Sequence, residues 1–240
     1  MSPRSARSTD QLPVAGVPIL AIEAASAQGS IAVAGARGQI VQRACAPGQR
    51  AVETLVPTMM ACLQEAEIAP RDVELIVVDL GPGGFTGIRA GVAVARAFCL
   101  ATGRPALGLT ALAIAADRAL AAGHPAPICV VRDAQRGELV VQSFDGDGNA
   151  REEPRLLEGA VVERQLGSDW RTLVRLGEVG RPLSVEAVHI EVSSAVDLLV
   201  AAKRRLDLGA VPVPGSRLRP FYLRPPDATP AAGDALVRAG

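Results

Sequence analysis

The 240-residue chain has few of the residues that most often carry charge-based binding or catalysis. Lys203 is the one lysine, against 24 arginines, and its helical setting places it on an exposed face, which argues against lysine-dependent catalysis. The net charge is zero, which excludes the overall basic field of proteins that bind nucleic acid by charge alone. Aromatic residues make up 2% of the chain, so its core must be aliphatic and rich in alanine.

Histidine and cysteine are also scarce. His124 and His189 are not spaced to place two imidazoles on one helix face, and the four cysteines lie far apart, so we expect no metal site. Free cysteines fit a reducing cytoplasm. No apolar run approaches 20 residues, and residues 1–16 lack the apolar stretch of a secretory signal. We therefore expect a cytoplasmic protein without membrane contact.

The first half of the chain predicts the order β-β-β-α-β-α-β. Its helices cover 52–66, with Pro57 either in the first turn or at a kink, and 86–102. The predicted strands are short apolar runs at 18–23, 29–34, 39–43, 75–78 and 106–109. This order is that of the ribonuclease-H-like unit from which actin-like ATPase folds are built, so the predicted class is a two-lobed α/β protein.

The second half predicts a helix at 110–122 and a last helix near 191–206. The strands predicted there are 128–132, 138–144, 174–176 and 187–190. We interpret the whole chain as four parts: a disordered extension 1–16, a first lobe 17–110, a second and degenerate lobe 111–211, and a proline-rich tail 212–240 that runs extended over the surface.

A glycine-rich turn, Gly-Pro-Gly-Gly-Phe-Thr-Gly at 81–87, joins a predicted strand to the long second helix. Free N–H groups at such a helix start can hold an anion or another backbone. Thr86 is the predicted N-cap. The motif lacks the lysine of a P-loop and the register of a dinucleotide-binding turn. It is therefore read either as a tight connection or as an anion site.

The residues that would form such an anion or cofactor site are Glu23, Ser26, Asp79, Gly83 and Gly84. Glu23 could form a metal-binding carboxylate pair with Asp79 or with Asp133 if their strands are neighbours, and Asp79 is the best single candidate. The alternative is that Asp79 hydrogen-bonds the glycine turn. No catalytic residue is predicted, because no nucleophile elbow or metal-binding histidine pair is present.

Two helices carry a possible contact surface. The 52–66 helix has a Val/Leu/Met stripe, and the 86–102 helix has small residues on several faces, which allow close helix approach. Either these stripes face their own sheet, or they form half of a helix bundle across an interface. The predicted contact residues are Val52, Leu55, Val56, Met59, Met60, Leu63, Phe85, Ile88, Arg89, Val92, Ala93 and Arg96.

Four blocks of the chain resemble the bacterial TsaB (YeaZ) family. The first is Ile-Leu-Ala-Ile-Glu-Ala-Ala-Ser at 19–26, followed by Ser-Ile-Ala-Val at 30–33. Residues 81–91 are similar to the family signature G-P-G-S-F-T-G-[VL]-R-[IA]-G. Residues 133–139 resemble its D-A-R-x-G-E-V turn, and residues 222–224 its Y-L-R. The resemblance covers about residues 18–227.

The resemblance implies an actin-like fold and a non-catalytic subunit that supports TsaD, which attaches a threonylcarbamoyl group to the adenosine beside the tRNA anticodon. It implies pairing with TsaD through first-lobe helices, a homodimer when alone, support of the ATPase TsaE, and tRNA contact only through the complex. No cofactor is required by the chain itself, and ATP or ADP at the complex interface stays open. Glu23, Ala24 and Ala51 depart from the family pattern, which weakens any expectation of nucleotide chemistry.

Other functions stay open at this point. An active small-molecule kinase or ATPase of the same fold is the main alternative, and a peptidase is a weaker one. Direct tRNA binding is a further alternative, through a basic patch of Arg204, Arg205, Arg217, Arg219 and Arg224.

Overall fold

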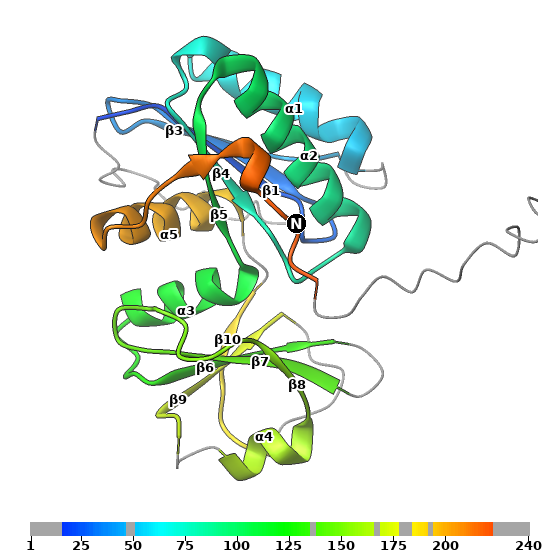
Figure 1. Ribbon diagram of the computed structural model, residues 1–240, viewed down its shortest axis with the longest axis vertical. Coiled ribbons are helices and arrows are strands. Elements are labelled where there is room, and N and C mark those ends of the chain that lie inside the picture. The colour runs from blue at the N-terminus through cyan, green and yellow to red at the C-terminus, as the bar shows by residue number, and fades with distance from the viewer. Residues whose placement is uncertain are drawn as a thin grey trace, which may run out of the picture.

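The computed structural model describes residues 16–46, 51–134, 138–165, 169–177, 184–191 and 194–222. Two β-sheets lie one above the other, with helices between and outside them (Figure 1). This is the predicted two-lobed α/β architecture. Except for Gly16, the predicted disordered extension lies outside the described residues, as does the tail beyond Tyr222.

The first sheet has six strands in the order β11-β5-β4-β1-β2-β3. They are β1 (Ile19–Glu23), β2 (Ser30–Ala34), β3 (Ile40–Ala44), β4 (Leu75–Asp79), β5 (Pro105–Leu109) and β11 (Val213–Pro214). β1 to β3 form the expected antiparallel meander, and β4 is parallel to both β1 and β5. β1 and β4 are buried along their whole length because helices cover both faces, which explains their continuous apolar sequences.

Three helices sandwich this sheet. α1 (Ala51–Glu65) and α2 (Phe85–Thr102) cover one face, and α5 (Ala195–Asp207) covers the other (Figure 1). Side chains alternate accordingly along β1: Leu20 and Ile22 belong to the core beneath α1 and α2, whereas Ile19 and Ala21 pack with α5. α5 is predicted within the second lobe, but the structure packs it on β1 and β2 of the first sheet.

The second sheet has the order β10-β9-β6-β7-β8. Its strands are β6 (Ile128–Asp133), β7 (Glu138–Phe144), β8 (Arg155–Glu158), β9 (Thr172–Leu176) and β10 (Val188–Ile190). α3 (Ala111–Ala121) packs on the face toward the first lobe, and α4 (Gly159–Gln165) lies on the far side (Figure 1). The sequence does not predict β8 and α4, because β8 is a partly exposed edge strand and α4 spans only two turns.

Two further segments differ in part from expectation. α1 begins at Ala51, one residue before the predicted start, so Pro57 lies inside the helix, on its exposed side, and not in its first turn. The proline-rich tail includes β11, which pairs with β5, and the short 3₁₀ helix η2 (Gly215–Arg217). A second 3₁₀ helix, η1 (Pro70–Asp72), precedes β4.

α2 is, within the described ranges, the one helix long and apolar enough to cross a membrane by length and composition. Its inner face belongs to the core of the first lobe, and a core helix meets the same criteria.

Candidate functional site

The glycine-rich turn at the start of α2 packs directly against the loop that follows β1. The Gly84 N–H donates to the Ala25 carbonyl oxygen at 2.9 Å. A Cβ added at Gly83 would lie 2.3 Å from that same oxygen, and one at Gly87 would lie 2.0 Å from the Ala24 oxygen. Glycine is therefore required for close backbone approach. The structure favours a tight connection over an anion site at this turn, because the carbonyl oxygens of Ala24 and Ala25 lie against its glycines.

The N-cap of α2 is Gly84, which has no side chain to accept a hydrogen bond. The predicted capping by Thr86 is wrong, because the helix already begins at Phe85 and Thr86 is its second residue.

Glu23 is buried and turns back on its own loop. One carboxylate oxygen accepts from the Ser26 N–H at 2.7 Å, and the other accepts from the Ser26 hydroxyl at 2.6 Å. The Ser26 hydroxyl in turn accepts from the Gly29 N–H. Burial raises the pKa of Glu23, while the hydrogen bonds from Ser26 lower it. Both Glu23 and Ser26 therefore serve the β1–β2 turn, which limits what they can offer to a ligand.

Asp79 lies beside Glu23, because β1 and β4 are parallel neighbours with Ile22 paired to Val78. One Asp79 oxygen accepts from the Gly81 N–H at 2.7 Å, so the hydrogen-bonding alternative is the one observed. The pKa of Asp79 is raised to about 7, chiefly by burial and also by the charge of Glu23, although the Gly81 hydrogen bond and the charge of Arg132 lower it.

Arg132 of β6 reaches this place from the second lobe. Its guanidinium donates to the Pro82 carbonyl oxygen in the glycine turn, and burial lowers its pKa. Its charge acts on both Glu23 and Asp79. The sequence did not single out Arg132, although its place directly before Asp133 at a strand end was a usable signal.

The five predicted cofactor residues thus gather at the carboxyl ends of β1 and β4. In the part of the chain that the structure describes, no three histidine, cysteine or acidic side chains are grouped to hold a metal ion. The geometry supports a structural junction between the lobes. The carboxylates of Glu23 and Asp79 are buried there and accept hydrogen bonds from Ser26 and Gly81, so they do not face outward as ligands.

The predicted contact residues divide into two groups. Five are buried in the core of the chain itself, so they are not available at a surface: Leu55, Met59, Leu63, Ile88 and Val92. For these the alternative interpretation, that the stripe faces its own sheet, is correct. Six are exposed: Val56, Met60, Phe85, Arg89, Ala93 and Arg96. The side chain of Val52 lies outside the described part of the structure.

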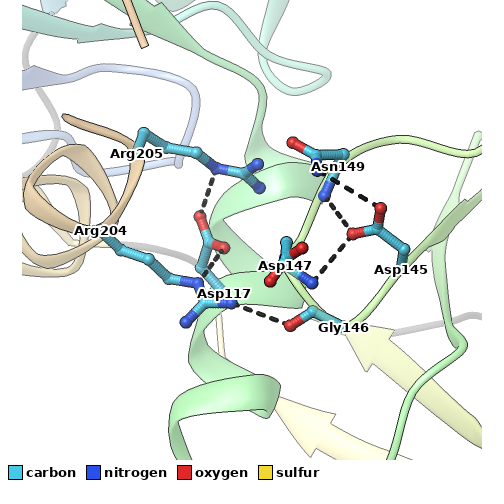
Figure 2. Close-up of polar contacts among 7 residues, drawn as sticks. All are labelled: Asp117, Asp145, Gly146, Asp147, Asn149, Arg204 and Arg205. Carbon is cyan, nitrogen blue, oxygen red and sulfur yellow. Dashed lines mark hydrogen bonds and ion pairs between the residues drawn. The ribbon is translucent and has the colours of Figure 1, made fainter. Parts of the chain in front are cut away.

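A second polar cluster, which was not predicted from the sequence, lies between the lobes (Figure 2). Asp117 of α3, only 3% exposed, accepts from Arg204 Nε at 3.1 Å and from Arg205 Nε at 2.8 Å, both on α5. Arg204 also donates to the Gly146 carbonyl oxygen in the β7–β8 turn. Burial raises the pKa of Asp117, and the two arginines oppose this.

This cluster corrects the basic patch considered from the sequence. Arg204 and Arg205 pair with Asp117 and are largely withdrawn from solvent, and Arg224 lies outside the described residues. Arg217 and Arg219 remain exposed.

The order of elements, the two sheets and the loops that meet between them define a protein with the actin-like ATPase, or ribonuclease-H-like, fold. The solved structure of YeaZ from Pseudomonas aeruginosa superposes with a TM-score of 0.71 at 24% identity, covering 86% of this chain and 100% of that one. This likeness establishes the fold.

Sequence comparisons carry the assignment further. A family model described as tRNA N6-adenosine threonylcarbamoyltransferase (TsaD) matches residues 47–155. An uncharacterized protein of Mycobacterium tuberculosis is 30% identical over 75% of this chain and 78% of its own length. TsaB of Bacillus subtilis is 31% identical over 53% of this chain and 52% of its own length. The chain belongs to the TsaB (YeaZ) family.

The matches do not span all of these relatives. The chain covers 57% of an uncharacterized relative from Mycobacterium leprae and about half of the B. subtilis TsaB protein.

Proposed function

We propose that this chain is a non-catalytic subunit in the synthesis of threonylcarbamoyladenosine in tRNA and that it acts by docking to TsaD. The relatives named for the biosynthesis of this modified nucleoside support the pathway. The observation that carries the non-catalytic part is the junction itself. Glu23 is bonded to Ser26, Asp79 to Gly81, and the glycine turn to Ala25, so the chain's own groups engage the candidate site.

The proposed contact face lies on α1 and α2, away from the sheet. Val56 and Met60 of α1 are 44% and 45% exposed, and the small residue Ala93 is exposed on α2. Apolar side chains beside small residues allow helices to approach closely across an interface. The same face would pair two copies of the chain when TsaD is absent.

In this proposal the protein works in the cytoplasm, supports TsaE through the assembled complex and needs no cofactor of its own. Binding of ATP or ADP, if it occurs, would be at the interface with TsaD.

The experiment is co-expression with TsaD of the same organism, followed by size-exclusion chromatography and a threonylcarbamoylation assay. Met60→Asp and Ala93→Asp should abolish co-elution and lower modification while the chain stays folded. Val211→Asp is the matched control, because Val211 is 79% exposed and lies outside both helices. Unchanged co-elution of both variants would reject this contact face.

Met59→Asp serves as a second comparison, since Met59 is adjacent to Met60 but only 5% exposed. We expect it to destabilise the fold by several kcal/mol, because a buried charge without a partner is costly. Loss of complex formation by this variant therefore carries no information about docking.

A further inference from the structure

The segment after β11 lies along α2, and two contacts fix its course. At Gly215 an added Cβ would lie 2.4 Å from the Cβ of Cys99, so the backbone presses against the far end of α2. At the other end the ring of Tyr222 lies 5.4 Å from that of Phe85, the first residue of α2. Residues 215–222 therefore run antiparallel to the helix, and their first part is η2, the orange turn beside α2 in Figure 1.

Arginines line this segment and the adjoining side of α2. Arg217 and Arg219 are exposed, whereas Leu218 between them is 3% exposed and belongs to the core, so the two arginines point outward. Arg89 and Arg96 are exposed on α2. We call these four arginines, together with Phe85 and Tyr222, the α2 strip.

The strip has no acidic residue of its own. Neither 85–102 nor 211–222 contains aspartate or glutamate. In the described ranges none of the four arginines forms an ion pair with a carboxylate. The strip therefore contributes four positive charges and no negative charge to this part of the surface.

Two of the six aromatic residues of the chain lie at one end of the strip. Phe85 is 45% exposed and Tyr222 is 38% exposed, whereas Phe98, Phe144 and Trp170 are buried. The Arg89 guanidinium lies 4.6 Å from the centre of the Phe85 ring. Exposed rings beside arginines form a surface on which an unpaired base can stack, and the arginines can follow the phosphates.

We propose that the α2 strip binds single-stranded RNA, with a base stacked on Phe85 and Tyr222 and the phosphate chain along the four arginines. This deepens the proposed function, on which it rests for the identity of the RNA as an unpaired loop of the tRNA. An acidic protein segment is disfavoured, because such a partner gains little from a pair of exposed aromatic rings.

The strip and the contact face adjoin on α2. At about 100° per residue, Phe85, Arg89 and Arg96 fall within an arc of about 40°, next to η2. Ala93 lies about 80° from Phe85 but only about 40° from Arg89, which precedes it by one turn. The two surfaces are therefore told apart by substitutions outside α2, at Met60 of α1 for docking and at Arg217 and Arg219 for RNA.

The experiment measures binding of fluorescein-labelled, unmodified tRNA by fluorescence anisotropy at several salt concentrations, for the full chain alone and for its complex with TsaD. Each single-strand phosphate contact contributes about 0.7 to the slope of log affinity against log salt. Arg217→Ala with Arg219→Ala should lower that slope by about 1.4. Arg37→Ala with Arg171→Ala is the matched control, because both residues are exposed and lie outside the strip.

Phe85→Ala should weaken binding by roughly five- to 150-fold, the usual range for loss of one stacked base, whereas Phe85→Tyr keeps a ring and should bind normally. Equal RNA affinity of all strip variants and wild type would overturn the proposal. So would loss of co-elution with TsaD in the arginine variant, which would make the strip a protein contact.

The two proposals can fail separately. If wild-type chain does not co-elute with TsaD, the proposed function fails, but selective loss of RNA binding by strip variants of the isolated chain still supports the strip. If wild-type chain binds no tRNA, alone or in the complex, the strip proposal is wrong and the docking function is unaffected.

Discussion

Gly87 shows how a single residue ties the glycine turn to the loop after β1. Helix propensity alone predicts that Gly87→Ala in α2 should stabilise the protein by up to about 1 kcal/mol. The structure predicts the opposite, because the new Cβ would lie 2.0 Å from the backbone oxygen of Ala24. We expect destabilisation by about 1–3 kcal/mol, measured as the free energy of unfolding in urea.

Gly84→Ala is the control for this prediction. Its Cβ would lie 3.7 Å from the nearest atom, which is ordinary contact, so only the smaller loss of a good N-cap residue is expected. Equal effects of the two substitutions would contradict the role of close approach.

Asp79 predicts a pH dependence of stability. Its pKa is raised to about 7 in the folded protein, against about 3.9 in the unfolded chain. Between these values the folded state holds the extra proton, so this residue makes the protein less stable as pH rises from about 4 to 7. Asp79→Asn removes the ionisation. Relative to wild type, the variant should gain about 2–3 kcal/mol of stability between pH 5 and pH 8 in urea unfolding.

A constant difference between the two proteins over this pH range would show that Asp79 is not the titrating group. At the residue scale, then, the sequence placed Asp79 correctly at the end of its strand beside the turn. The proton affinity of Asp79 depends on burial and on Glu23, which only neighbouring strands bring together.

At the scale of elements, Asp117 connects α3 and α5, and Arg204 extends the link to the β7–β8 turn (Figure 2). Asp117→Ala removes the carboxylate that pairs with Arg205. The Arg205 side chain is only 12% exposed, so water cannot fully replace this partner. Breaking a buried ion pair from one side typically costs about 3–5 kcal/mol. We expect a loss of this size, measured by urea or thermal unfolding.

Lys203→Ala is the matched control on the same helix. Lys203 pairs with Asp207, which is 63% exposed, so its loss should cost less than about 0.5 kcal/mol. A small effect of Asp117→Ala, similar to this control, would mean that the cluster does not hold the elements together.

Long elements with a clear period were predictable, and short or edge elements were not. β1, β4 and α2 carry strong apolar patterns, and their observed bounds lie close to the predicted ones. For α1 the sequence left the place of Pro57 open, and the structure puts this exposed proline inside the helix. The burial of Met59 beside the exposed Met60 follows from the exact rotation of α1 on the sheet, which periodicity alone leaves open.

At the scale of the molecule, the first lobe is built from both ends of the described chain. Ile19 and Ala21 of β1 pack with Leu198 and Leu199 of α5, and β11 completes the edge of the same sheet. A fragment of residues 17–110, the predicted first lobe, lacks both α5 and β11 and would expose one face of its sheet. We expect it to be aggregated or largely unfolded by circular dichroism and size-exclusion chromatography.

A soluble, monomeric fragment 17–110 with cooperative unfolding would contradict this dependence on α5. The full-length chain, under the same conditions, is the reference for native secondary structure and size.

The sequence by itself determined the strand and helix order, the glycine turn and the family, because these depend on local period, backbone chemistry and motif spacing. Only the tertiary structure decided that α5 closes the first lobe, that Arg204 and Arg205 pair with Asp117, and that Arg217 and Arg219 lie along α2. These outcomes join residues that are distant in the chain. Burial and charge pairing depend on which helices and strands pack together, and the local sequence pattern of one element does not determine its packing partners.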